Sequence, residues 1–233
     1  MNQPQRDAYD YTHLGQGVAQ TDQNVVLRKT YGLLGLSFIP CLAGAFVGMQ
    51  FNFVSLFSNY WLSIIAFFAF FYGMCFAIEK NRYSNVGAAL LMVFTFGLGF
   101  MLGPILQLSS TFSNGGQLVA LAAAMTAGVF LVMAVVARRT NVNMNGLGRF
   151  LMVGAVVLMV GVVANLFLKL PVLSLTLAAA FVIFSSLLIM WQIRTVIDGG
   201  ETSHISAALT IFISLYNIFT SLLQILLALS GRE

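Results

Sequence analysis

Charged side chains are scarce in this sequence, and their scarcity argues against a water-soluble fold. Only 8% of its 233 residues are Asp, Glu, Lys or Arg, and 59% are hydrophobic. An ordinary soluble domain has about 25% charged residues. A chain with so few charges cannot hide its apolar surface from water, so we predict a membrane protein whose partner is the lipid bilayer.

Cysteine and histidine are also rare, and no catalytic motif is present. The two cysteines, Cys41 and Cys75, lie inside apolar segments and are too few for a disulfide framework or a metal site. The two histidines, His13 and His204, are far apart, and the sequence lacks an HExxH pair, a nucleophile elbow and a phosphate-binding glycine loop. We therefore expect neither an enzyme nor a cofactor. The basic residues are scattered over separate loops, so a nucleic-acid partner is not expected either.

Long apolar segments are what the sequence has in abundance. A spanning helix needs about 20 apolar residues, and seven segments free of charge approach or reach that length. They do not alternate between apolar and polar residues, as the strands of a membrane barrel would. The segments cover residues 31–50, 60–78, 86–107, 117–137, 150–168, 172–193 and 206–229. The sequence thus predicts an all-α integral membrane protein, a bundle of seven transmembrane helices.

The distribution of Lys and Arg predicts the orientation of this bundle. If the N-terminus is cytoplasmic, Lys169 and Arg232 alone of the 11 basic residues face the other side. Lys and Arg are retained on the cytoplasmic side of membrane proteins, so this asymmetry favours a cytoplasmic N-terminus. An odd number of spans then places the C-terminus in the periplasm.

The first 27 residues are polar and lack hydrophobic periodicity. They do not combine a charged start, an apolar core and a small-residue cleavage site, so we predict no cleavable signal peptide. We expect residues 1–27 to be a disordered cytoplasmic tail and residues 28–230 to be the transmembrane domain. The tail is either a frayed terminus or a handle for another protein, and removing residues 1–26 would distinguish the two.

Polar side chains recur on one face of the last span, at spacings of 4, 3, 4 and 3 residues, as expected for one side of a helix. The preceding span adds two more, and the fifth span ends with one. The eight residues are Thr210, Ser214, Asn217, Ser221, Gln224, Ser185, Gln192 and Asn165. We predict that they form a polar seam inside the bundle. The seam either provides interhelical hydrogen bonds worth about 0.6 kcal/mol each or lines a hydrated path or a small-ligand site. No ionisable side chain lies near a span centre, which weighs against a proton relay.

Small residues repeat every four positions in three spans, a pattern that allows neighbouring helix backbones to approach closely. The repeats are Gly44 with Gly48, Gly99 with Gly103, and Ala120 with Ala124 and Gly128. They predict a compact bundle and indicate no particular function.

Four segments are distinctive enough to carry a resemblance. They are LGPIL at 102–106, VANLFLKLP at 163–171, IDGGET at 197–202 and ISLYNIFTSLLQIL at 213–226. With them, the chain from about Val26 to Gly231 resembles the Bax inhibitor-1 family, and most of all its bacterial YccA-like branch. The long match around the last two helices is the most specific part of this resemblance.

The resemblance implies a seven-helix protein of the bacterial inner membrane with a cytoplasmic N-terminus. For the YccA-like branch it implies association with FtsH, the membrane-anchored AAA+ protease, as a modulator that limits the turnover of membrane proteins. Other members of the family are pH-sensitive calcium leak pathways that use two acidic residues on the last two helices. Gln192 and Ser214 hold the matching positions here.

That difference has a consequence for a channel function. Neither Gln192 nor Ser214 titrates, so the switch that two neighbouring carboxylates provide should be absent. Three functions remain open at this point: a protease modulator, a calcium leak channel without the acidic pair, and a structural membrane protein whose polar seam only fixes helix packing.

Overall fold

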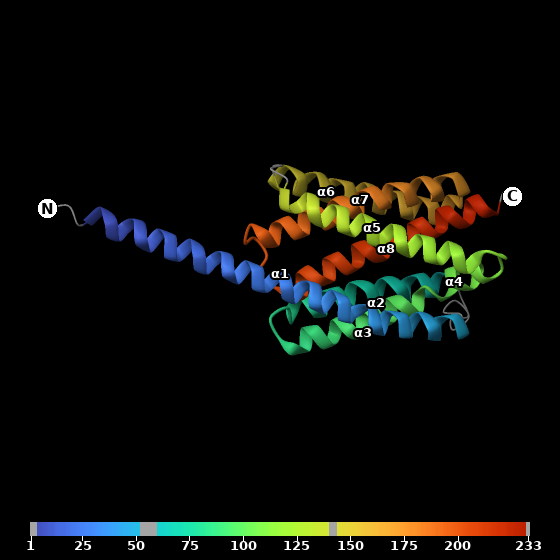
Figure 1. Ribbon diagram of the computed structural model, residues 1–233. Coiled ribbons are helices and arrows are strands. Elements are labelled where there is room, and N and C mark those ends of the chain that lie inside the picture. The colour runs from blue at the N-terminus through green and yellow to red at the C-terminus, as the bar shows by residue number, and fades with distance from the viewer. Residues whose placement is uncertain (1–3, 52–59, 140–143, 232–233) are drawn as a thin grey trace.

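The protein is helical throughout the part of the chain that a computed structural model describes, namely residues 4–51, 60–139 and 144–231, with side chains from residue 23 onward. Figure 1 shows the helices packed lengthwise as one bundle. The helices are α1 (Pro4–Gln50), α2 (Tyr60–Lys80), α3 (Asn85–Met101), α4 (Gly103–Ser110), α5 (Gly115–Arg139), α6 (Met144–Leu168), α7 (Pro171–Ile197) and α8 (His204–Ser230). The polar breaks at residues 52–59 and 140–143 lie outside the described residues.

Seven helical segments are long and apolar enough to cross a membrane, which confirms the predicted fold class. They are Gln23–Gln50, Trp61–Lys80, Asn85–Ser110, Gly115–Arg139, Met144–Leu168, Pro171–Ile197 and His204–Ser230. Several extend beyond the apolar runs because the helices continue into polar flanks, as α5 does through Arg138 and Arg139. The first span enters and α8 ends at opposite ends of the bundle (Figure 1).

The third span is interrupted at Leu102, which divides it into α3 and α4. Pro104 lies in the first turn of α4, where the missing N–H of proline costs no helical hydrogen bond. The Leu102 amide donates to the carbonyl of Gly99 at 2.9 Å, a tighter turn than an α-helix makes. The sequence prediction of one unbroken span over 86–107 did not include this break.

The helical backbone of α1 begins at Pro4, ahead of the first membrane-spanning segment. It projects from the bundle as a long extension (Figure 1). A helix that is already formed adds one hydrogen bond per residue without a new nucleation step. The disorder expected for residues 1–27 and the proposed limit between tail and membrane domain at residue 27 both stay predictions.

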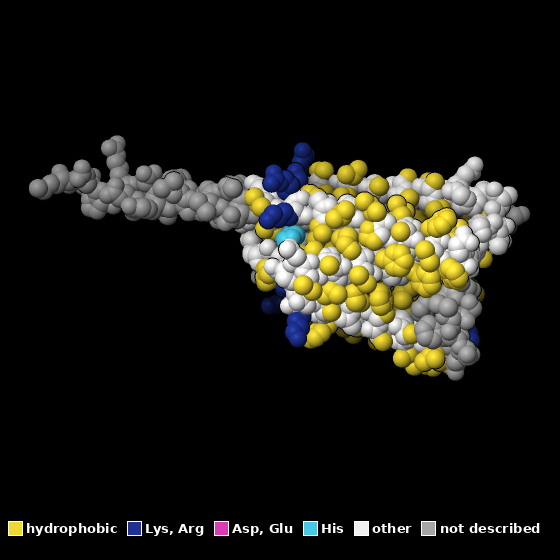
Figure 2. Space-filling model, turned by 90° about the horizontal axis from the view of Figure 1, so that it is seen from below, with side chains coloured by type: hydrophobic (Ala, Val, Ile, Leu, Met, Phe, Trp, Pro, Cys, Tyr) yellow, Lys and Arg dark blue, Asp and Glu magenta, His cyan; other side chains and the backbone are white. Residues whose placement is uncertain are grey.

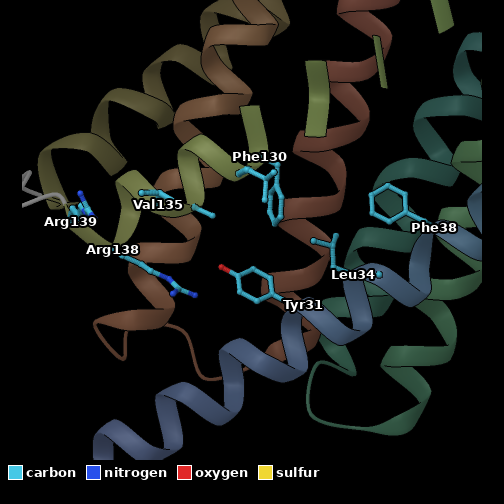
Figure 3. Close-up of a pocket in the computed structure, with 10 residues that line it drawn as sticks. Tyr31, Leu34, Phe38, Phe130, Val135, Arg138 and Arg139 are labelled. Atoms are coloured by element: carbon cyan, nitrogen blue, oxygen red, sulfur yellow. The ribbon is translucent and has the colours of Figure 1, made fainter. Parts of the chain in front are cut away.

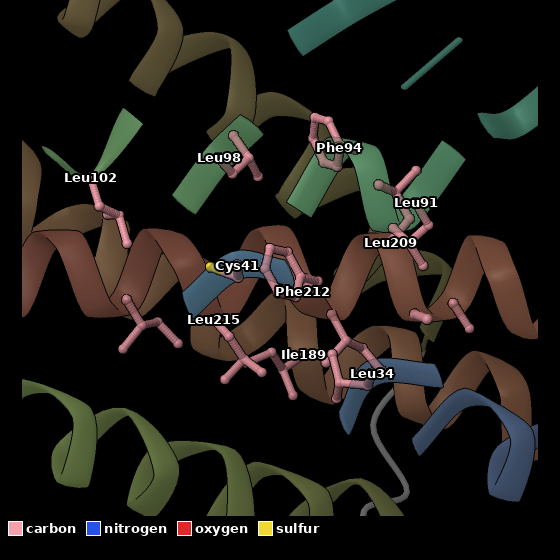
Figure 4. Packing of buried hydrophobic residues seen from close by; sticks show 14 of the residues in the cluster. Leu34, Cys41, Leu91, Phe94, Leu98, Leu102, Ile189, Leu209, Phe212 and Leu215 are labelled. Carbon is pink, nitrogen blue, oxygen red and sulfur yellow. The ribbon is translucent and has the colours of Figure 1, made fainter. Parts of the chain in front are cut away.

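The last helix, α8, is the centre of the bundle. It contacts α1, α2, α3, α4, α5 and α7. Half of the residues in its most apolar 18-residue stretch are buried, a larger share than in any other described span. Figure 4 shows Phe212 and Leu215 of α8 among side chains from its neighbours, including Leu34 of α1, Phe94 of α3 and Ile189 of α7. Polar side chains on α8 therefore lie at or next to the protein interior.

Glycines bring α1 and α3 into backbone contact, as their spacing predicted. A Cβ atom added at Gly44 would lie 2.0 Å from the carbonyl oxygen of Phe96, and one added at Gly99 would lie 2.0 Å from the carbonyl oxygen of Cys41. Such distances are far inside van der Waals contact. Only glycine fits at these two positions with the backbones this close.

The repeat of small residues on α5 behaves differently. Ala120, Ala124 and Gly128 are exposed, and a Cβ added at Gly128 would meet no heavy atom within 4 Å. The predicted close approach is therefore wrong for this helix. The interior side of α5 carries Ala122 and Thr126 instead, because a small-residue repeat looks the same in sequence whether it faces a helix or lipid.

Candidate functional site

The eight residues of the predicted seam lie on α6, α7 and α8, and they differ in depth. Ser185, Gln192, Ser214 and Ser221 are buried, while Asn165, Thr210, Asn217 and Gln224 are half-buried. The buried and half-buried members on α8 follow one side of that helix because their spacing matches its turn. The polar face thus lies within the bundle or at its edge.

Gln192 and Ser214, the positions that match the acidic pair of the family, are both buried but are not bonded to each other. The Ser214 hydroxyl donates to the carbonyl oxygen of Thr210 at 2.8 Å, one turn earlier on the same helix. Gln192 is 4% exposed, and no hydrogen bond joins its amide to α8 within the described residues. Both positions therefore hold neutral polar groups away from water.

One direct side-chain hydrogen bond connects α7 and α8 in the seam. The Gln224 amide donates to the Ser174 hydroxyl at 2.6 Å. Ser174 and Asn165 both line an open pocket of about 520 Å³ at the turn between α6 and α7. Asn165 itself stabilises that turn, because its side-chain oxygen accepts from the Leu170 amide at 3.2 Å.

Ser185 is the exceptional member of the seam. It is 0% exposed, and its hydroxyl oxygen has no hydrogen-bond partner in the part of the chain that the structure describes. The neighbouring Ser186 hydroxyl, by contrast, donates to the carbonyl oxygen of Val182 at 2.6 Å. An unpaired buried polar group costs about 1–3 kcal/mol and calls for a water, an ion or another explanation.

A charged cluster at one end of the bundle was not predicted from the sequence. Arg82, in the turn after α2, pairs with the carboxylate of Glu79 at 3.3 Å and with that of Glu201, between α7 and α8. The Ser206 hydroxyl donates to Glu79 at 2.5 Å. The Ser203 hydroxyl donates to the Arg82 carbonyl oxygen at 2.6 Å. These contacts join two turns that lie far apart in the sequence.

The electrostatics of this cluster keep Arg82 charged. Burial lowers the pKa of the Arg82 guanidinium. The charges of Glu201, Tyr83 and Glu79 together raise this pKa by a larger amount, so it lies above the ordinary value. The Tyr83 and Thr202 hydroxyls add a 3.1 Å hydrogen bond between the same two turns. The only signal of this cluster in the sequence is the opposite charge of Glu79 and Glu201 to Arg82.

In the described part of the chain, no three His, Cys, Asp or Glu side chains are grouped so that they could hold a metal ion. Both carboxylates of the charged cluster are engaged by Arg82. Cys41 and Cys75 are free thiols inside spans. The seam offers hydroxyl and amide groups, which can solvate water or a weakly held cation.

Comparison with known proteins gives a consistent match over nearly the whole chain. The profile of the family described as inhibitor of apoptosis-promoting Bax1 matches residues 23–231. An uncharacterized protein of Neisseria meningitidis is 60% identical over 231 residues, which cover 98% of this chain and 100% of that protein. A protein of Escherichia coli K12 named modulator of FtsH protease YccA is 38% identical over 202 residues, 86% of this chain and 89% of that protein. The same protein in another Escherichia coli strain is named inner membrane protein YccA.

Proposed function

This chain belongs to the Bax inhibitor-1 family, and on that premise we propose that it is a multi-pass protein of the bacterial inner membrane that associates with the protease FtsH and limits the turnover of membrane proteins. The observation that carries the proposal is the 38% identity to a named modulator of FtsH over 86% of this chain. A shared fold alone does not determine function. The proposal therefore rests on this relative and on features of the chain that suit such a role.

The N-terminal extension of α1 is the first such feature. The family match begins at residue 23, where the first spanning segment also begins, and the helix continues outward from there to Pro4 (Figure 1). The positive-inside rule assigns this end of the bundle to the cytoplasm, because the basic ends of α2, α5 and α7 lie there. An ATP-driven protease works from that side, so the extension is accessible to it.

The charged cluster is the second feature. A protein that occupies a protease without being consumed has to resist local unfolding of its loops. Arg82, Glu79 and Glu201 tie the α2–α3 turn to the α7–α8 turn on the proposed cytoplasmic side. These contacts raise the cost of pulling either turn into an unfolding enzyme.

Co-purification and a degradation assay test the proposal together. The tagged chain, isolated from its native membrane in mild detergent, is expected to bring FtsH with it, and its presence is expected to slow the degradation of a model membrane substrate. A variant that lacks residues 2–22 keeps every described membrane span and tests the extension. It is expected to bind the protease more weakly or slow degradation less. No association and no change in degradation by the full chain would contradict the proposal.

A calcium leak is a second candidate, favoured by one observation. The unpaired Ser185 hydroxyl is fully buried on α7, and α7 packs against α8, which carries the polar face. In that reading, replacing Asn217 or Gln224 with Leu alters cation flux in reconstituted vesicles. If the same replacements change only thermal stability, the seam serves helix packing.

A further inference from the structure

A groove between α1 and α5 is unused by the proposed functions. Both helices pack on α8, and they meet each other at the rings of Tyr31 and Phe130, whose centroids lie 6.0 Å apart. The outer part of the groove has a volume of about 640 Å³ and opens beside Tyr31 and Arg138 (Figure 3). A deeper part of about 380 Å³ continues from it, since both parts share Leu34, Phe38 and Phe130. Volumes of this size are typical of ligand sites.

The deeper part of the groove is apolar and as long as one leaflet. It extends along α1 from Leu34 to Ala45 and reaches Leu106 of α4. From Leu34 to Ala45 the helix rises about 16.5 Å at 1.5 Å per residue, about half of a hydrocarbon core about 30 Å thick. Thr126 adds little polarity, because its hydroxyl already donates to the Ala122 carbonyl oxygen at 2.7 Å. The shape and chemistry suit a hydrocarbon chain.

The mouth of the groove is basic. Arg138 and Arg139 end α5 there, and neither forms a salt bridge with another described residue. The Tyr31 hydroxyl is buried and has no hydrogen-bond partner among the described residues. Figure 3 shows this hydroxyl directed across the opening toward the Arg138 guanidinium. The Tyr31 hydroxyl and the Arg138 guanidinium thus lie at the same opening, and Arg139 adds a second positive charge to the mouth.

The surrounding surface has the same character. Figure 2 shows dark blue side chains gathered at the end of the bundle from which α1 projects, with hydrophobic side chains over the middle of that face. A basic rim over an apolar band matches the interface of a membrane with acidic lipids, where each Lys or Arg contributes about 1 kcal/mol.

We propose that the groove between α1 and α5 is a binding site for an anionic phospholipid. The phosphate accepts hydrogen bonds from Arg138 and the Tyr31 hydroxyl, Arg139 adds positive charge at the mouth, and one acyl chain lies along the apolar groove. Guanidinium groups suit this task because they bind phosphate oxygens in pairs. The topology proposed above places the site in the cytoplasmic leaflet.

A second groove, between α6 and α7, supplies a comparison. It is larger, about 930 Å³, but its lining includes Asp198 as well as Arg149. Asp198 accepts from Arg194 at 2.9 Å, so Arg149 is the one uncompensated charge among the described residues that line this groove, against the two arginines, Arg138 and Arg139, that line the groove between α1 and α5. Arg149 is therefore a control for the loss of an arginine beside a different groove.

Thermal stability of the full chain in mild detergent, measured with added lipid, tests the site. Phosphatidylglycerol is expected to raise the melting temperature more than phosphatidylcholine does. The variant R138Q/R139Q is expected to lose this preference, with an affinity loss of about fivefold per arginine, while R149Q keeps it. Y31F removes only the unpaired hydroxyl and is expected to fold and to bind phosphatidylglycerol more weakly.

Two further arms separate the lipid from other occupants. Inorganic phosphate at the same concentration is expected to give no stabilisation, and A127F, which fills the apolar part, is expected to abolish the effect of phosphatidylglycerol. Equal stabilisation by both lipids, an unchanged preference in R138Q/R139Q, or an effect of phosphate alone would overturn the proposal. Native mass spectrometry would also overturn the proposal if the wild-type chain held a protein segment and no lipid, and if A127F lost that segment.

Discussion

The guanidinium of Arg82 pairs with the carboxylate of Glu201, 119 residues later in the chain. The Glu201 side chain is 13% exposed and that of Arg82 31%, so water screens the pair only in part. It joins the turn after α2 to the turn before α8 and thereby connects the two-helix unit α2–α3 to the central helix.

Replacement of Arg82 with Gln is expected to lower the free energy of unfolding by about 1–3 kcal/mol, because two carboxylates lose their charged partner. The measurement is thermal unfolding in detergent. K80Q is the matched control, since Lys80 is exposed at the end of α2. Equal stability of R82Q and K80Q would show that the cluster contributes nothing.

A methyl group at Gly99 is expected to destabilise the bundle, because its Cβ would lie 2.0 Å from the Cys41 carbonyl oxygen and force α1 and α3 apart. G99A should therefore unfold at a clearly lower temperature than wild type. G128A is the control, since a Cβ there meets no heavy atom within 4 Å and alanine favours helix over glycine by up to about 1 kcal/mol. A G99A protein as stable as G128A would contradict the close approach.

Removal of the Gln224 amide is expected to cost little stability. Q224L loses the 2.6 Å bond to Ser174, and such contacts in membrane proteins are worth about 0.6 kcal/mol on average. A double-mutant cycle with S174A measures the coupling. Unfolding and calcium flux in vesicles are measured on the same variants, to show whether Gln224 serves packing alone. A changed flux with unchanged stability would favour the calcium leak function.

Gln192 and Ser214 are expected to give no pH dependence to any calcium flux through this chain, because neither side chain titrates. Introducing both carboxylates, in Q192D/S214D, is expected to add a flux that rises with pH as the buried acids ionise and attract cations. Flux assays in vesicles over the neutral range check both statements. A strong proton-gated flux in the wild-type chain that disappears in Q192L or S214A would contradict the expectation.

The spans were readable from the sequence because a bilayer allows only long apolar helices to cross it. The last span, predicted at 206–229, is observed as His204–Ser230. The break at Leu102 was not read, because Pro104 is accommodated in a first helical turn as readily as it kinks a helix. The small-residue repeat of α5 was misread because the sequence does not say which neighbour a helix face meets.

The candidate site was predictable in part, because residues at helical spacing lie on one face of a helix. The helical spacing of Thr210, Ser214 and Asn217 identified one face of α8, and the depth of Ser214 agrees with an inward position. The partner of each polar group was not predictable, since Ser214 bonds within its own helix. The Arg82–Glu201 pair was not predictable from a local sequence pattern, because the packing of the helices brings these two residues together.

Association with FtsH is tested by a pull-down of the tagged wild-type chain from its native membrane, joined to a degradation assay of a membrane substrate. We expect FtsH to co-purify with the chain and degradation to be slower in its presence than in membranes that lack it. Purification of the intact chain without FtsH, together with an unchanged degradation rate, would contradict this expectation.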